Sequence, residues 1–356
     1  MKSLFPDPVC SAPLSDSEIK VALQLLIRGD VGDDWKGDFL TCLHRRGETA
    51  SELAGFARAI LEEGVAVSIA HDAGHPLLEL CGTGGDRAGF LNISTAAMFV
   101  AAGAGARVVK HGNRAVSSRC GSADVLETLG VTIHLKPQSE GAILEKAGSV
   151  FLLASDFHPS IGVLAPLRRS LASRGHLTIF NLLGPLLNPA LPEVQLTGIF
   201  KHELLDFYAQ ALGMMGRRKA WAVHGKGLDD SEGVDELSIT GPSRVFSSSR
   251  EGEGESVITE FVIDPLELGF SRVELPNQLL GGDALENARR IVAILSGQEI
   301  GAARDMIVLN AAAALHLAGF GGSLEEAITI ANESIDSGKA LTALDLLRVH
   351  SKAGAA

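Results

Sequence analysis

Glycines and an acid directly follow a short apolar run and could bind phosphate. Gly82-Thr83-Gly84-Gly85-Asp86 comes straight after Leu77–Cys81. Glycines at a strand end let backbone N–H groups approach a phosphate, and the helix opening near Asn92-Ile93-Ser94-Thr95 offers its N-terminus to an anion. Its amide and hydroxyl side chains can also cap that helix or bind phosphate or a metal. Taken alone, the segment is explained equally by an ordinary tight turn, because it matches neither the Rossmann nor the P-loop pattern.

A second segment gathers cations, hydroxyls and glycines after another apolar run. It reads Lys110-His111-Gly112-Asn113-Arg114-Ala115-Val116-Ser117-Ser118-Arg119-Cys120-Gly121-Ser122. No acid lies between Asp86 and Asp124, and five cations there give +5, namely Arg87, Arg107, Lys110, Arg114 and Arg119. In a chain with a net charge of -12, such a run favours a phosphate-rich ligand over a solvated loop.

A third segment also lacks acids. It runs from His158-Pro159 through Pro166-Leu167-Arg168-Arg169 to Asn181–Pro189. Arginine can hold a carboxylate with two parallel hydrogen bonds, although the prolines could instead shape a hinge between domains. In a fourth segment, acids crowd after the apolar run that ends at His224, as Asp229-Asp230 and Asp235-Glu236. A few carboxylates with substrate phosphates suit Mg²⁺, but such acids are more often a solvated loop.

Composition limits the class of protein. The 356 residues include 31 Lys and Arg against 43 Asp and Glu, and 46% are hydrophobic, which is typical of a globular protein of one large or two smaller domains. Net acidity and a 5% aromatic content argue against a nucleic-acid coat. The four cysteines match neither a zinc site nor a dense disulfide frame. Without a secretory h-region, and with its most apolar stretch, Ala96 to Val109, too short for a bilayer, we expect a soluble cytoplasmic protein.

Hydrophobic periodicity divides the chain into a helical part and an alternating part. Capping boxes at Ser15 and Thr49, with a third pattern ending near Gly47, predict three helices in about the first 70 residues. From Pro76, apolar runs alternate with helical stretches, which indicates βαβ units and a parallel sheet. The predicted strands are 77–81, 107–110, 131–135, 150–154, 195–200 and 220–224, and the predicted helices are 95–104, 123–129, 203–214, 283–295, 300–317 and 324–337. Residues 241–258 are predicted to form a loop or an edge hairpin.

Together these segments resemble the anthranilate phosphoribosyltransferase family. GTGGD…NIST, KHGNRAVSS…GSADVLE, FHP…APLRR, TIFNLLGPLLNPA and VDELS occur in that family's order. The likeness covers nearly the whole chain, including DALENARRIVAILSG and RDMIVLNAAAALHLAG. Several long motifs in order are specific, whereas GTGGD alone is shared by related folds.

The resemblance implies two domains with the active site in the cleft between them. Residues 1–74, joined by a helical insertion at about 164–194, would form a helical domain that commonly mediates a homodimer. Residues 75–163 and 195–356 would form an α/β domain with a mainly parallel central sheet flanked by helices. The implied reaction transfers the phosphoribosyl group of 5-phosphoribosyl 1-diphosphate to the amine of anthranilate, releasing pyrophosphate, in tryptophan biosynthesis.

The resemblance also assigns roles to residues. Lys110, Arg168, Asp235 and Glu236 would be catalytic, and Ser94 would hold Mg²⁺ with the two acids. Around the substrates we expect Gly82, Gly85, Asp86, Asn92, Ile93, Ser94, Thr95, Lys110, His111, Gly112, Asn113, Arg114, Ala115, Val116, Ser117, Ser118, Ser122, His158, Arg168 and Gly184. Of these, Asn113 and Arg168 would bind anthranilate, while His111, His158 and Gly184 would line its path. Because the acceptor amine is already neutral at pH 7, we expect no single side chain to be an essential general base.

The chain departs from the family pattern at three places. After Asp86 it has Arg87 and Phe90 where the family usually has Gly and then Thr. The linker 170–177 is longer than usual and lacks the customary Arg before Thr178. The metal loop is longer too, so that 227–230 competes with 234–237 for the family's DGLDE position. Asp235-Glu236 is the preferred pair because Leu237-Ser238 follows in the family's order.

Two other interpretations remain open. A pyrimidine nucleoside phosphorylase would share the fold but carry a Lys-Ser pair ahead of the glycines, where this chain has Leu80-Cys81. A non-enzymatic, nucleic-acid-binding relative should show a basic surface and a degraded acceptor site. This chain is acidic and has both Asn113 and Arg168.

Overall fold

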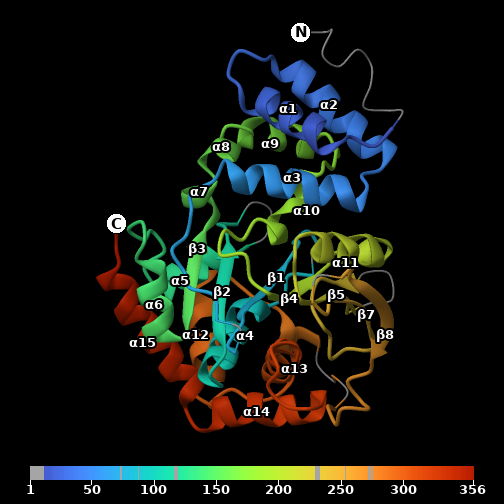
Figure 1. Cartoon of the computed structure of the whole chain (residues 1–356). Helices are drawn as coiled ribbons and strands as arrows, with labels where there is room; N and C mark the ends of the chain where they lie inside the picture. Colours follow the sequence, from blue (N-terminus) through green and yellow to red (C-terminus); the bar gives the residue numbers. More distant parts are fainter. Residues whose placement is uncertain are drawn as a thin grey trace.

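A mixed sheet forms the centre of the computed structural model, which describes residues 12–72, 74–86, 88–115, 119–228, 233–252, 254–271, 273 and 276–356. Its main strands lie in the order β3-β2-β1-β4-β5-β7-β8, with β6 paired to β5 (Figure 1). The strands are β1 (Leu77–Gly82), β2 (Arg107–Gly112), β3 (Ser149–Leu153), β4 (Val194–Gly198), β5 (Lys219–Lys226), β6 (Gly233–Val234), β7 (Ser243–Ser249) and β8 (Val257–Ile263).

The order of the strands reverses between β1 and β4. The five strands from β3 to β5 are parallel, and the chain winds outward from β1 to β3 before it returns to β4 on the other side of β1. In open α/β sheets, ligands bind at such a reversal, outside the carboxyl ends of the strands. The segment expected at 241–258 to be a loop or an edge hairpin is a hairpin that extends to Ile263: β7 pairs antiparallel with β5, and β8 pairs antiparallel with β7 at the edge of the sheet.

Alternation along each strand sends side chains into two cores. On β5, Trp221 and Val223 belong to the larger core, whereas Ala220 and Ala222 belong to the second. α4 (Ile93–Gly103) and α13 (Ala302–Leu317) pack on the first face, and α11 (Leu205–Met214) packs on the other. The larger core is completed by α5 (Ser122–Thr128), α6 (Glu140–Ala147), α12 (Ala284–Leu295), α14 (Leu324–Asp336) and α15 (Lys339–Ala353). The expected α/β class is confirmed.

A helical bundle lies beyond the carboxyl ends of the parallel strands (Figure 1). Its helices are α1 (Asp16–Ile27), α2 (Asp33–Arg46), α3 (Ala50–Glu62), α8 (Pro159–Gly162), α9 (Ala165–Ser173) and α10 (Phe180–Leu183), and α7 (Ala154–Phe157) connects it to β3. The bundle shares the second core with α11, because Tyr208 is fully buried and donates a hydrogen bond to the carbonyl of Leu182 at 2.7 Å. The domain boundaries expected from the sequence stay predictions.

Some sequence predictions about the elements were wrong. Residues 131–135 are not a strand, although Val131 and Ile133 alternate into the core, because their backbone makes only an isolated bridge from Leu135 to Ala355. The last helix, α15, was not predicted. Cys42 on α2 is disulfide-bonded, which the cysteine spacing did not suggest. Among the described residues, no helix is both long enough and apolar enough to cross a bilayer.

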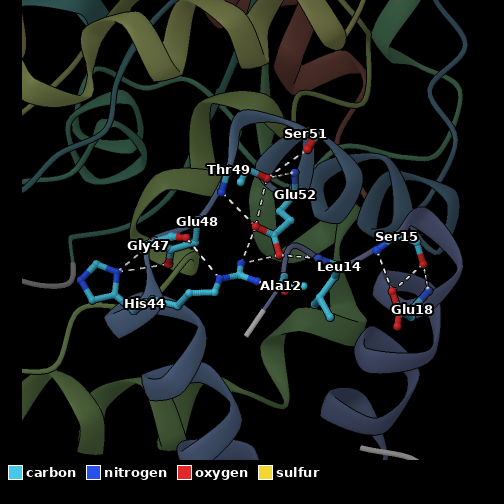
Figure 2. Close-up of polar contacts among 11 residues, drawn as sticks. Ala12, Leu14, Ser15, Glu18, His44, Gly47, Glu48, Thr49, Ser51 and Glu52 are labelled. Carbon is cyan, nitrogen blue, oxygen red and sulfur yellow. Dashed lines mark hydrogen bonds and ion pairs between the residues drawn. The ribbon is translucent and has the colours of Figure 1, made fainter. Parts of the chain in front are cut away.

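Glu52, at the start of α3, connects α3 with α2 and with the segment before α1 (Figure 2). Its buried carboxylate closes the predicted capping box by accepting the N–H of Thr49 at 2.9 Å, accepts the N–H of Leu14 at 2.8 Å, and pairs with Arg46 at the end of α2. Burial alone would raise the pKa of Glu52, but these hydrogen bonds outweigh it and hold the pKa below its usual value of 4.5. Glu18 closes a similar box on α1 but is exposed.

Replacing Glu52→Gln should therefore destabilise the protein by about 2 kcal/mol, because Arg46 loses its partner in a buried pair. Since the pKa is lowered on folding, the stabilisation is present above pH 4.5 and is lost as pH falls through the lower folded-state value. Urea denaturation at pH 7 and pH 3.5 measures both effects. Glu18→Gln, the same change in an exposed box, is the control; equal costs for both variants would contradict the role of burial.

Candidate functional site

A glycine turn (82–86) and an acidic segment (235–236) meet at the carboxyl ends of β1 and β4. The turn needs glycine because Gly84 and Gly85 have φ angles of +71° and +91°. The backbone at Asp235 crosses the ends of both strands so closely that a Cβ on Gly198 would lie 1.5 Å from the Asp235 carbonyl oxygen, and one on Gly82 would lie 2.4 Å from its Oδ2. Only glycine at the two strand ends permits this approach.

The acids of this segment accept hydrogen bonds from backbone N–H groups of the glycine turn and of α4. Gly84 N–H donates to Asp235 Oδ2 at 2.6 Å, and Ser94 N–H donates to Glu236 Oε1 at 3.3 Å. Asp86 accepts the N–H of Asp235 at 3.4 Å. Burial raises the pKa of Asp235 well above its usual value, and repulsion from Asp86 and Glu236 adds to this. Burial likewise raises the pKa of Glu236 to about 8, against the opposing effect of Lys110.

Lys110 is a cation that interacts with this acidic group. Its ammonium donates to the carbonyl of Leu80 at 2.6 Å and to Ser94 Oγ at 3.1 Å, and the residue is only 2% exposed. Burial lowers the pKa of Lys110, whereas Glu236 and Asp235 favour its charged form. Ser94, Lys110, Asp235 and Glu236, predicted from segments far apart in the sequence, are thus brought together.

The residues present fit a divalent cation that is shared with a ligand. Asp235 and Glu236 repel each other and each uses only one oxygen in the hydrogen bonds above. Within the described residues no three His, Cys, Asp or Glu side chains form a ready-made metal cage. Mg²⁺ commonly takes one or two carboxylates and fills its remaining positions with water and substrate phosphates, so the absence of a cage agrees with this ion.

A second group lies on the opposite face of β2, toward the bundle. The rings of His111 and His158 meet edge to face at 5.4 Å, and His158 Nε2–H donates to the carbonyl of Leu187 at 2.7 Å. Burial lowers the pKa of His111 to about 3, with repulsion from His158 as the next cause, while the backbone of Gly184 opposes the shift. Both imidazoles are therefore neutral at pH 7, since burial also lowers the pKa of His158.

Arg168 on α9 is a cation without a carboxylate partner among the described residues. Its Nη2 donates to the carbonyl of Phe180 at 3.3 Å, and its guanidinium lies 5.3 Å from the Phe180 ring centroid. Burial lowers the pKa of Arg168, and no acid opposes that effect. A partly buried guanidinium of this kind is suited to an incoming carboxylate.

Several residues predicted to meet substrate are used otherwise in this structure. Asn92 does not cap α4 with its side chain; its amide donates to Cys120 O at 3.1 Å and accepts from Asn287 at 2.9 Å. Asn92 is thus the N-cap residue of α4, but the side-chain capping that its type allowed is not formed. Ile93 and Thr95 are buried and about 1% exposed. Their assignment to the substrate site stays a prediction.

The argument from charge was only partly correct. Arg114 is paired with Asp124 and Glu127 on α5, so its guanidinium is not free for a phosphate. Arg107 begins β2, at the end of the sheet away from the site, and pairs with Glu145. The sequence showed no acid nearby because the compensating acids come from later helices.

The loop after β2 has the tight packing expected of a ligand-binding turn. A Cβ on Gly112 would meet Ser122 Oγ at 2.3 Å, and Asn113 O accepts from Ala123 N–H at 3.2 Å. Asn113 is exposed, and the N–H of Ala115 is taken by Asp124 at 2.9 Å. The predictions for Arg87, Val116, Ser117, Ser118 and the alternative pair Asp229-Asp230 lie outside the described residues.

Two asparagines that sequence reasoning missed hold the site in place. Asn310, buried on α13, donates to Leu237 O at 2.8 Å and accepts from Leu237 N–H at 3.0 Å, which fixes the acidic segment. Asn287, buried on α12, bonds Asn92 and accepts from Gly282 N–H at 2.7 Å. The sequence signal that could have found them is an asparagine on the apolar face of a predicted helix.

Comparison with known proteins identifies two matching family models. The "Glycosyl transferase family, helical bundle domain" matches residues 11–64, and the "Glycosyl transferase family, a/b domain" matches residues 74–341. Among curated proteins, anthranilate phosphoribosyltransferase from Rubrobacter xylanophilus is 44% identical over 94% of this chain and 92% of its own length. The enzyme of that name from Moorella thermoacetica is 40% identical over 98% of this chain and 97% of its own.

Solved structures agree with these matches. Anthranilate phosphoribosyltransferase from Thermus thermophilus has a TM-score of 0.86 and 37% identity, covering 99% of this chain and 100% of its own. The enzyme from Saccharomyces cerevisiae, solved in complex with PRPP and Mg, has a TM-score of 0.82 and 28% identity, covering 96% of this chain and 94% of its own.

The approach of Asp235 to Gly198 can be tested directly. In Gly198→Ala the added methyl group would overlap the Asp235 backbone, so the acidic segment must move. We expect Mg²⁺-dependent binding of inorganic pyrophosphate, measured by calorimetry, to weaken at least about tenfold while the circular dichroism spectrum is retained. Gly32→Ala, whose methyl group meets nothing within 4 Å, is the control. Unchanged pyrophosphate affinity in Gly198→Ala would show that the segment's position is unimportant.

Proposed function

This chain belongs to the anthranilate phosphoribosyltransferases of the glycosyl transferase family, and we propose that its two side-chain groups bind the two substrates of that reaction on either face of β2. The phosphoribosyl group of 5-phosphoribosyl 1-diphosphate is transferred to the amine of anthranilate, and pyrophosphate leaves. The observation that carries the assignment is the joining of Ser94, Lys110, Asp235 and Glu236 beside the glycine turn. The activity serves tryptophan biosynthesis.

The glycine-turn group would bind the diphosphate of the donor. Ser94, Asp235 and Glu236 would hold Mg²⁺, which when bound neutralises charge on the pyrophosphate as it leaves. Lys110 would supply a positive charge on the same side, and the N-terminus of α4 would favour an anion there. Holding these groups in place before the reaction lowers the barrier because little reorganisation is needed as charge develops. The yeast relative solved with PRPP and Mg supports this reading.

The group on the bundle side would bind anthranilate. Arg168 would pair with the carboxylate and so turn the amine toward C1 of the ribose, which is a contribution of orientation rather than proton transfer. Asn113, His111, His158 and Gly184 would line the acceptor's path. A yeast relative solved with 4-fluoroanthranilate supports binding of this class of ligand. The neutral imidazole of His111, with its pKa near 3, is not suited to store a proton at pH 7, in line with a reaction without an essential general base.

The remaining features of the resemblance are proposals as well. We propose a homodimer formed through the helical bundle, which sedimentation velocity would detect, and a cytoplasmic location. The helical part at 1–74 with the insertion at about 164–194, and the α/β part at 75–163 and 195–356, are proposed as the two domains, which share the second core.

The function is tested by mixing the protein with Mg²⁺, 5-phosphoribosyl 1-diphosphate and anthranilate. Anthranilate fluorescence should fall with time, and pyrophosphate should appear in equal amount. Leaving out either Mg²⁺ or the donor is the control and should stop the loss of fluorescence. Folded protein that consumes no anthranilate, and instead binds nucleic acid in a salt-sensitive way, would contradict the proposal.

Arg168→Ala should mainly impair the use of anthranilate, because the guanidinium is assigned to its carboxylate. We expect kcat/KM for anthranilate to fall by roughly 10- to 100-fold, the loss of one charge-assisted contact, while the KM for the donor changes less than about twofold. Arg169→Ala changes the exposed neighbour on α9 and is the matched control. Equal losses for both substrates would mean that Arg168 has another role.

A further inference from the structure

Two polar side chains stand in the centre of the parallel sheet. Glu79 on β1 and Gln195 on β4 are paired in register, and both are fully buried. Strands covered on both faces normally carry near-continuous apolar runs, and a buried carboxylate is unfavourable unless it is paired and hydrogen-bonded. On both strands the neighbouring side chains, such as Leu80 and Leu196, enter the larger core, so that Glu79 and Gln195 lie on the face toward α11 and the bundle.

A buried arginine completes this pair. Arg217, 1% exposed and located between α11 and β5, donates through Nε to Gln195 Oε1 at 2.7 Å. Burial raises the pKa of Glu79 to about 7, and Arg217 is the strongest influence in the opposite direction. Within the described residues, Glu79 Oε2 has no hydrogen-bond partner, and neither has Arg217 Nη2. Opposite charges are thus placed in one buried layer with Gln195.

Glu79 and Gln195 each make a hydrogen bond to a backbone group near the proposed anthranilate site. Glu79 Oε1 accepts the N–H of His111 at 3.2 Å. Gln195 Nε2 donates to the carbonyl of Pro185 at 2.7 Å, in the 3-10 turn η1 (Gly184–Leu186). His111 and Gly184 are the residues assigned above to the path of anthranilate, and the Gly184 backbone acts on the His111 ring.

Side chains connect β1 and β2 toward their carboxyl ends, because the backbone pairing of the two strands stops early. Their pairing is recorded from Leu77 with Arg107 and Leu78 with Val108, whereas β2 stays paired with β3 as far as Gly112. Beyond this point Asn188 donates to Val109 O at 2.8 Å, and the Lys110 ammonium donates to Leu80 O. The distance between the two strand ends is therefore set by side-chain length and charge instead of by a backbone ladder.

We propose that Glu79, Gln195 and Arg217 are positioning residues that hold the end of β2 and the η1 turn at the separation that anthranilate requires. The inference rests on the proposed function, because it uses the assignment of His111 and Gly184 to the acceptor. Glu79 acts through the amide of His111 and Gln195 through the carbonyl of Pro185, whereas Arg217 acts through the side chain of Gln195. The donor-side contacts of Gly84, Ser94 and Asp235 are formed separately.

The test compares Glu79→Gln with Glu140→Gln. Glu140 on α6 is also buried, its pKa is also raised by burial, and its Oε2 also has no partner, so the chemical change is matched away from the site. We expect Glu79→Gln to raise the KM for anthranilate about tenfold and to leave the KM for 5-phosphoribosyl 1-diphosphate within about twofold. Glu140→Gln should leave both KM values as in the parent protein, whatever its thermal stability.

A second variant decides the matter if Glu79→Gln does not fold. Gln195→Leu keeps the approximate size of the side chain and removes its hydrogen bonds to Pro185, Arg217 and Cys81. It should show the same selective rise in the KM for anthranilate. Parallel changes in both KM values, or none, in a folded variant would overturn the inference while the parent protein still turns over anthranilate. Absence of turnover in the parent protein would overturn the proposed function, and the inference with it.

Discussion

The close passage of the Asp235 backbone over the ends of β1 and β4 is the constraint on which the site depends. Asp86, Asp235 and Glu236 repel one another, so they would separate unless the backbone were fixed. Glycines at 82 and 198 leave room for the segment, and Asn310 holds it from the α13 side. Packing and hydrogen bonds elsewhere in the domain therefore stabilise the close approach of the three acids. A bound cation would reduce the repulsion between them.

The second core has a related consequence for the relative position of the two halves. The bundle does not have a core of its own, because Tyr208 and Ala222 of the α/β part are buried in the same cluster as Leu53 and Leu183. A hinge between the halves would have to break this cluster. Pro185 lies buried in the η1 turn, which packs within the structure instead of forming a free hinge.

Local hydrogen bonding explains which elements could be predicted. The capping boxes at Ser15 and Thr49 involve residues three apart, and both helices begin where the sequence indicated. The segment at 131–135 was predicted to be a strand because its apolar residues alternate. Its pairing depends on Ala355, more than 200 residues later, and amounts to a single isolated bridge. Residue types alone indicated the glycine turn at 82–86 and the acidic pair at 235–236. They could not show that Arg114 would be neutralised, since that depends on how α5 is oriented.

The alternation of side chains at the end of β2 places the Lys110 ammonium against Ser94 and the His111 ring against His158, on opposite faces of one strand. Gain or loss of one residue between Arg107 and Lys110 would reverse the two, sending an imidazole to the diphosphate and a charged amine into the acceptor side. A gain or loss of two residues would keep both side chains on their present faces, so it is an odd change in the length of β2 that this arrangement does not tolerate.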